Sequence, residues 1–202
     1  GTDEKDRLHL RAASLLAERA NEDLSNDALF RVVHHVAAIK NAGLLRQSAS
    51  RYRQLILLAT RRAKSTGDYV SALRFLQATQ RMDAPLTAEE DFTFTLEAAE
   101  CEFLHGNLST AQEHCGRLLS APGNPTDKAI AACMMAEIHM RRSDSKLALE
   151  TAIAWLAVFG IHLNRDPDKA ECDAARIKLK EQVGKNPYTS LRPPPLTDRT
   201  SA

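Results

Sequence analysis

Apolar residues recur every three or four positions along most of the chain, and the strict alternation of a half-buried strand is nearly absent. This spacing places apolar side chains on one face of a helix, so the pattern predicts an all-α chain of about nine helices. Gly, Pro and helix-capping residues separate the periodic stretches. From these signals we expect helices over about 4–20, 26–40, 48–64, 69–76, 87–104, 108–118, 126–141, 144–159 and 168–183.

The same periodicity predicts which side chains each helix buries. In the first helix the stripe is Leu8, Ala12, Leu15 and Leu16. In the last of the expected hairpins, Trp155 and Phe159 are predicted to lie in the core. The two clearest stripes are Leu29, Val32, Val33, Val36 and Ile39 in the second helix, and Tyr52, Leu55, Ile56, Ala59 and Ala63 in the third.

A short phrase occurs three times, each time between two predicted helices, with the copies 39 and 37 residues apart. Its first position suits the positive φ that ends a helix, and its Ala suits a close approach of two backbones. One such hairpin cannot bury its apolar face alone, so the repeat predicts a right-handed stack of helical hairpins. The copies are Gly67-Asp68-Tyr69 with Ala72, Gly106-Asn107-Leu108 with Ala111, and Ser143-Asp144-Ser145 with Ala148.

Composition and charge narrow the class of partner. The 202 residues are 44% hydrophobic and 26% charged, as in ordinary globular proteins, and 27 basic residues against 26 acidic ones give a net charge of +1. Nucleic-acid and membrane-surface binding both rest on excess positive charge, so neither is expected. No apolar run approaches the roughly 20 residues of a membrane span. The four cysteines have no paired spacing and are expected to be reduced thiols in the cytoplasm.

We divide the chain into a helical-repeat domain, residues 1–183, and a Pro-rich tail, residues 184–202, that is extended or disordered. The chain starts without a methionine and stops in this Pro-rich stretch. We therefore expect it to be a piece of a longer protein.

The spacing of Gly67, Tyr69 and Ala72 resembles the turn and second helix of a tetratricopeptide repeat, although the repeats here exceed the usual length. A resemblance to a second family covers nearly the whole chain. It is carried by five phrases in order: Asp68–Leu76, Glu97–Gly106, Asp127–Ala129, Leu156–Leu163 and Leu191–Asp198. These resemble the helical segment that follows the P-loop ATPase module in bacterial hybrid Ser/Thr–histidine kinases and related signalling ATPases and transcriptional regulators.

What this resemblance implies is a regulatory scaffold rather than a catalyst. The chain has no Gly-x-x-x-x-Gly-Lys-Ser/Thr loop, so the ATP site of such a protein would lie outside it. We assign no catalytic, cofactor-binding or metal-binding residue.

Several histidines and cysteines are candidate metal ligands. His34 and His35 are adjacent and point about 100° apart on a helix, so they are poorly placed to share an ion. Cys101 with His105, and His114 with Cys115, could together offer four zinc ligands from two facing helices. Both cysteines also fall on apolar stripes, where a free thiol behaves as a small hydrophobic group, and we prefer this core interpretation. The carboxylates of 89–102 are interpreted as a solvated face.

The third predicted helix is basic and the fifth is acidic. In stacked hairpins the first helix of each pair tends to line the concave side. Transferring the tetratricopeptide groove positions by register predicts a partner-binding face with both signs of charge, suited to an extended peptide or a neighbouring domain. Its residues are Gln54, Arg61, Lys64, Thr93, Glu100, Glu137 and Arg141.

The function predicted from the sequence is protein–protein or interdomain interaction within a cytoplasmic multidomain signalling protein. The alternative is a small-molecule effector-sensing domain of an ATPase-type transcriptional regulator, which requires a pocket lined by Trp155, Phe159 and polar groups. Nucleic-acid binding and catalysis rank below both.

Overall fold

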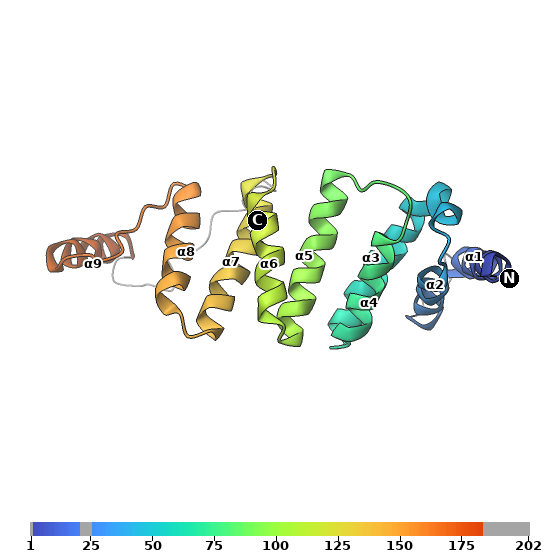
Figure 1. Cartoon of the computed structure of the whole chain (residues 1–202). Coiled ribbons are helices and arrows are strands. Elements are labelled where there is room, and N and C mark those ends of the chain that lie inside the picture. The colour runs from blue at the N-terminus through green and yellow to red at the C-terminus, as the bar shows by residue number, and fades with distance from the viewer. Residues whose placement is uncertain (1, 21–25, 184–202) are drawn as a thin grey trace. The chain divides into compact units, whose positions relative to one another are not determined.

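The computed structural model describes residues 2–20 and 26–183. The described residues form helices and connecting loops, without a strand among them, which confirms the predicted all-α fold. Contacts divide the chain into two compact units, residues 1–121 (unit 1) and 122–202 (unit 2), which are described separately (Figure 1).

Unit 1 consists of three helical hairpins placed side by side (Figure 1). The helices pair as α1 with α2, α3 with α4, and α5 with α6, and α2 and α4 also pack on the following hairpins. The right-handed superhelix stays a prediction. The elements are α1 (Thr2–Ala20), α2 (Asn26–Ala38), the 3₁₀ helix η1 (Ala42–Ser48), α3 (Ala49–Ser65), α4 (Tyr69–Gln80), α5 (Ala88–His105) and α6 (Leu108–Ser120).

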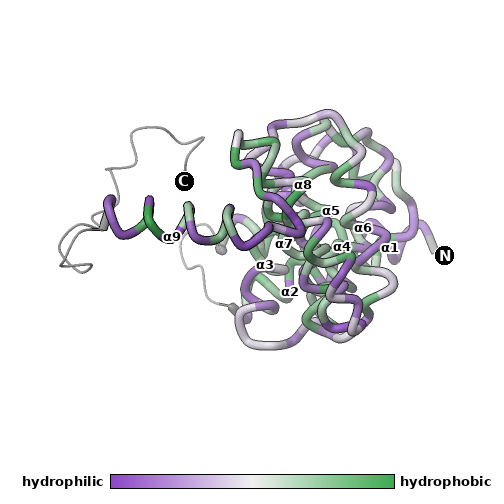
Figure 2. Tube along the Cα trace, turned by 90° about the vertical axis from the view of Figure 1, so that its left-hand side faces the viewer, coloured by the Kyte–Doolittle hydropathy of each residue, from purple (hydrophilic) through white to green (hydrophobic). Residues whose placement is uncertain are grey.

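Unit 2 contains a fourth hairpin, α7 (Pro125–Arg141) packed on α8 (Ser145–Val158), followed by α9 (Lys169–Val183). None of the described side chains of α9 is buried, and hydrophilic and hydrophobic residues alternate along it (Figure 2). In the described part of the chain, every helix is too short or too polar to cross a membrane. The predicted tail, residues 184–202, lies outside the described residues.

The repeated phrase forms the same turn three times. Gly67, Gly106 and Ser143 have φ values of 80°, 95° and 62°. In each copy the next residue's amide donates to the carbonyl five residues back, at 2.8–2.9 Å, which is the bond that closes a helix with a left-handed final residue. Asp68 and Asp144 then cap the following helix with their side chains. The local geometry of the repeat is therefore confirmed.

The three alanines of the phrase lie where the helices of each hairpin pack. Ala72 and Ala111 are fully buried, and Ala148 is nearly so. The predicted capping box is also present, because Thr87 Oγ1 accepts from Glu90 N and Glu90 Oε2 accepts from Thr87 N. Several element ends differ from expectation: α2 stops at Ala38, α4 continues to Gln80, and α7 begins at Pro125 behind an Asn124 cap.

Ser143 occupies a left-handed conformation that favours glycine, so Ser143→Gly is expected to raise the stability of the α7/α8 hairpin by about 0.5–1 kcal/mol. Trp155 is the only tryptophan, and its fluorescence during urea unfolding reports on this hairpin. Ser145→Gly, at the first residue of α8, is the control and should not stabilise. A lower midpoint for Ser143→Gly would contradict the prediction.

The expected inner stripe of α1 was wrong for Leu8 and Leu15, whereas Leu16 does pack against the core. Leu8 and Leu15 are 64% and 54% exposed, whereas Ala13 and Ala17 are fully buried. The cause is a buried acid: Asp6 Oδ2 accepts hydrogen bonds from Lys40 N at 3.1 Å and Asn41 N at 2.8 Å. These two bonds tie α1 to the end of α2 and set its rotation, which the apolar pattern alone did not indicate.

The core of unit 1 is otherwise close to the prediction. All five residues expected for the second helix are buried, including Ile39 just after α2. In α3 four of the five are buried, with Leu55 packed at the edge. The periodicity missed Phe75, which is 1% exposed. In unit 2 the core placement of Phe159 was wrong, because this residue follows the last residue of α8 and is 45% exposed. Trp155 is half-buried.

Candidate functional site

The first helices of the second and third hairpins, α3 and α5, run in parallel and are joined by ion pairs. Paired residues are separated by nearly constant intervals: 37 for Arg53 with Glu90, and 36 for Arg61 with Glu97 and for Lys64 with Glu100. A constant interval means that the helices lie side by side in one register, one repeat apart. We call the surface formed by residues 53–64 and 89–100 the α3/α5 face.

One end of this face is an ion cluster around Glu97, whose side chain is 8% exposed. Arg61 Nε donates to Glu97 Oε1 and Lys64 Nζ to Glu97 Oε2, both at 2.6 Å, and Lys64 also binds Glu100. Burial by itself lowers the pKa of Lys64, but hydrogen bonds to Glu100 and Glu97 outweigh it and leave this pKa raised. The ammonium group of Lys64 is therefore charged, and it donates hydrogen bonds to the carboxylates of Glu97 and Glu100.

The other end of the face is held by Arg53, whose side chain is 5% exposed. Its guanidinium donates to Glu90 Oε2 and to the carbonyl of Pro85, both at 3.2 Å, and also to the carbonyl of Ala84. Glu90 at the same time closes the capping box of α5. Arg53 therefore fixes the α4–α5 loop and the start of α5 against α3.

Beside Arg53 the α3/α5 face opens into a groove of about 280 Å³. Gln54 and Glu89 are exposed at its rim, and Thr93 and Leu57 are half-buried. Phe94 is buried at 8% exposure and supplies apolar surface. The groove therefore combines apolar contact area with hydrogen-bonding and acidic groups.

The structure distributes the predicted partner-binding residues over three places. Gln54 and Thr93 line the groove. Arg61, Lys64 and Glu100 belong to the ion cluster and bind one another through Glu97 rather than standing free. The remaining two, Glu137 and Arg141, are exposed on α7 in unit 2.

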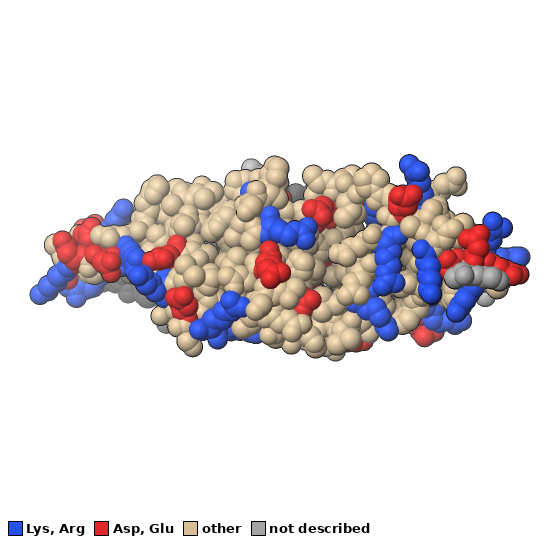
Figure 3. Space-filling view, in the orientation of Figure 1, with Lys and Arg blue, Asp and Glu red and all other residues tan. Residues whose placement is uncertain are grey.

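The interpretation of all carboxylates of 89–102 as a solvated face was wrong for Glu97, which is buried between two cations. Sequence analysis also missed the buried role of Arg53. One signal in the sequence was available for both residues. Arginines of the third predicted helix are followed 36 or 37 residues later by glutamates of the fifth, which is close to the spacing of the repeated phrase. Figure 3 shows Lys and Arg side chains gathered over the N-terminal part of unit 1.

Cys101 and Cys115 are completely buried, which confirms the core interpretation. Burial raises the pKa of each thiol to about 11. His34 and His35 have separate contacts. His34 Nε2 lies 2.9 Å from Arg74 Nη2, and His35 Nδ1 lies 2.9 Å from His9 Nδ1. Among the described residues, no three His, Cys, Asp or Glu side chains gather closely enough to hold a metal ion.

No protein-family model, curated protein or solved structure matches this chain.

Proposed function

We propose that this chain is an interaction scaffold in a cytoplasmic multidomain signalling protein, such as a sensor kinase or a signalling ATPase. It binds a protein, or a neighbouring domain of its parent, through the α3/α5 face. It takes no catalytic part and does not bind nucleic acid. The observation that carries the proposal is the groove beside Arg53. Its apolar and polar side chains lie outside the ion cluster around Glu97 and can contact a ligand.

The groove suits an extended peptide with a basic residue next to an apolar one. The amide of Gln54 and the hydroxyl of Thr93 can each donate and accept hydrogen bonds with a peptide backbone. Leu57 and Phe94 offer contact to an apolar side chain. Arg53 neutralises Glu90, so Glu89 supplies the remaining negative charge at the rim, which favours Lys or Arg in the ligand.

Occupancy of the groove would be transmitted through the packing of α3 against α5. The ion cluster holds one end of these helices and Arg53 holds the other, so a ligand wedged between Gln54 and Thr93 acts on the contacts of Arg53 while the cluster keeps its register. The resulting tilt between hairpins is the signal that a neighbouring ATPase or kinase domain would receive.

The test is selection of random peptides displayed on phage against the whole chain, followed by fluorescence polarisation of the enriched sequences. Peptides with a basic residue beside an apolar one are expected to be enriched. Gln54→Arg adds positive charge at the groove and should weaken these peptides by about tenfold, since about 1.4 kcal/mol corresponds to a factor of ten. Gln47→Arg makes the same change at an exposed position outside the groove and should leave binding unchanged. Peptides that bind both variants equally would refute the proposal.

A further inference from the structure

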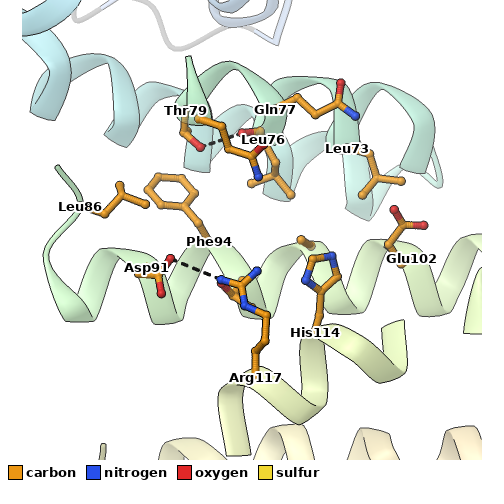
Figure 4. Close-up of a pocket in the computed structure, with 13 residues that line it drawn as sticks. Leu73, Leu76, Gln77, Thr79, Leu86, Asp91, Phe94, Glu102, His114 and Arg117 are labelled. Carbon is orange, nitrogen blue, oxygen red and sulfur yellow. Dashed lines mark hydrogen bonds and ion pairs between the residues drawn. The ribbon is translucent and has the colours of Figure 1, made fainter. Parts of the chain in front are cut away.

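A second hollow lies in unit 1, and Phe94 lines both it and the groove beside Arg53. It is a cavity of about 220 Å³ between α4, α5 and α6. Side chains of α4 face those of α5 across it, while His114 and Arg117 reach in from α6 (Figure 4). Leu73, Leu76 and Phe94 give it apolar walls. Because three helices contribute, the cavity is part of the packed hairpins rather than a feature of one loop.

His114 is a polar group of this cavity without a satisfied hydrogen bond. Its Nδ1 atom is buried, and no donor or acceptor in the described part of the chain reaches it. Leaving such an atom unpaired costs about 1–3 kcal/mol. Less than 1 Å² of it is accessible, so a ligand in the cavity meets the other ring nitrogen, or reaches Nδ1 after the ring turns. Burial lowers the pKa of His114, and Arg117 acts in the same direction. The imidazole is therefore neutral near pH 7 and has one nitrogen able to accept a hydrogen bond.

The charges that line the cavity favour a cation over an anion. Asp91 and Glu102 carry two negative charges against one positive charge on Arg117, which leaves a net charge of −1. Arg117 Nη2 lies 3.8 Å from Asp91 Oδ1, and both side chains are more than half exposed. Glu102 lies near His114 in Figure 4 and accepts one hydrogen bond, from Asn107 Nδ2 at 2.6 Å. Its carboxylate has further acceptor positions.

The volume limits the size of the ligand. At about 30 Å³ per molecule, the cavity holds roughly seven waters. Sites for drug-sized ligands begin at about 300 Å³, so the cavity suits a compact ligand of a single ring. Displacing water from Leu73, Leu76 and Phe94 favours a ligand with apolar faces.

We propose that this cavity binds a small organic cation with a flat apolar body, whose N–H groups donate to Glu102 and to the imidazole of His114. The two hollows share Phe94 alone, so variants at Glu102 and at Gln54 test each site without changing the other. It would give the scaffold a small-molecule input in addition to a protein partner.

Three probes with the same number of non-hydrogen atoms separate charge from shape: benzamidine is a cation, benzamide is neutral and benzoate is an anion. Each is titrated into the whole ¹⁵N-labelled chain while amide chemical shifts are followed. Benzamidine is expected to shift amides around the cavity, including Thr79, Ala98 and His114, with benzamide weaker and benzoate without effect. Equal shifts with benzoate, or no shift at these amides with benzamidine, would overturn the proposal.

Two variants tie binding to the named groups. Glu102→Gln should weaken benzamidine by about tenfold, through loss of a charge-assisted hydrogen bond. Glu113→Gln makes the same change at an exposed position of α6 that does not line the cavity, and should bind as the wild type does. Should Glu102→Gln fail to fold, Ala98→Leu narrows the cavity and must abolish binding. Unchanged affinity in either cavity variant would refute the site.

Discussion

Raising the pH from 8 to 11 is expected to lower the free energy of unfolding by about 4 kcal/mol through two buried thiols, Cys101 and Cys115. Burial raises the pKa of both from 9.0 to about 11. At a pH between 9 and 11 the two thiols have lost their protons in the unfolded chain, whereas they keep them in the folded chain. The folded state therefore binds more protons, and its stability falls as the pH rises.

The measurement is urea unfolding, followed by circular dichroism under reducing conditions, at several pH values from 8 to 11. Cys101→Ala and Cys115→Ala should each remove about half of this contribution. Cys133→Ala and Cys172→Ala, at exposed positions, should leave the pH dependence unchanged. The raised pKa of Lys64 acts in the same direction above pH 10.5, but it is common to all four variants. The same pH dependence in all four would contradict the prediction.

Replacing Arg53 by Met is expected to destabilise unit 1 by about 3 kcal/mol, because it removes one partner of a buried ion pair. Met keeps most of the side-chain volume, so the loss reports on polar contacts rather than on a cavity. The change leaves Glu90 without its cation and the carbonyls of Ala84 and Pro85 without a donor. The substitution also removes one unfavourable feature of the wild type, because Arg53 Nε is buried without an acceptor in the described part of the chain.

Urea unfolding at pH 7 checks this value. Arg51→Met changes an exposed arginine on the same helix and should alter the stability by less than about 0.5 kcal/mol. In a double-mutant cycle with Glu90→Gln, the two changes should be strongly non-additive. A loss below about 1 kcal/mol for Arg53→Met would show that the clamp on the α4–α5 loop contributes little.

Much of the fold could be predicted from local patterns. In unit 1 the buried faces of α2 and α3 follow the apolar period closely, whereas that of α1 does not. The turns at Gly67 and Gly106 were expected from residue type alone. Ser143 was placed by analogy with the two glycines, and its positive φ shows that the phrase, rather than glycine itself, marks the turn. Such features depend on neighbours within about five residues, which is why periodicity and caps reveal them.

The candidate site was only partly predictable. Gln54 and Thr93 were selected by register and do line the groove. Lys64 and Glu100 were selected as members of a recognition surface, but each neutralises the other across 36 residues. A single sequence shows the sign of each charge without its partner, so a paired ion and a free one look alike.

By itself, the sequence determined the helices, their turns and the small residues where helices cross, because these follow from backbone geometry and short-range hydrogen bonds. Only the tertiary structure decided which charges are buried together, how Asp6 rotates α1, and where His114 is left without a partner. These outcomes depend on contacts between residues a whole hairpin apart. Desolvation then decides whether a charged side chain is a solvated group, a structural tie or a candidate ligand-binding group.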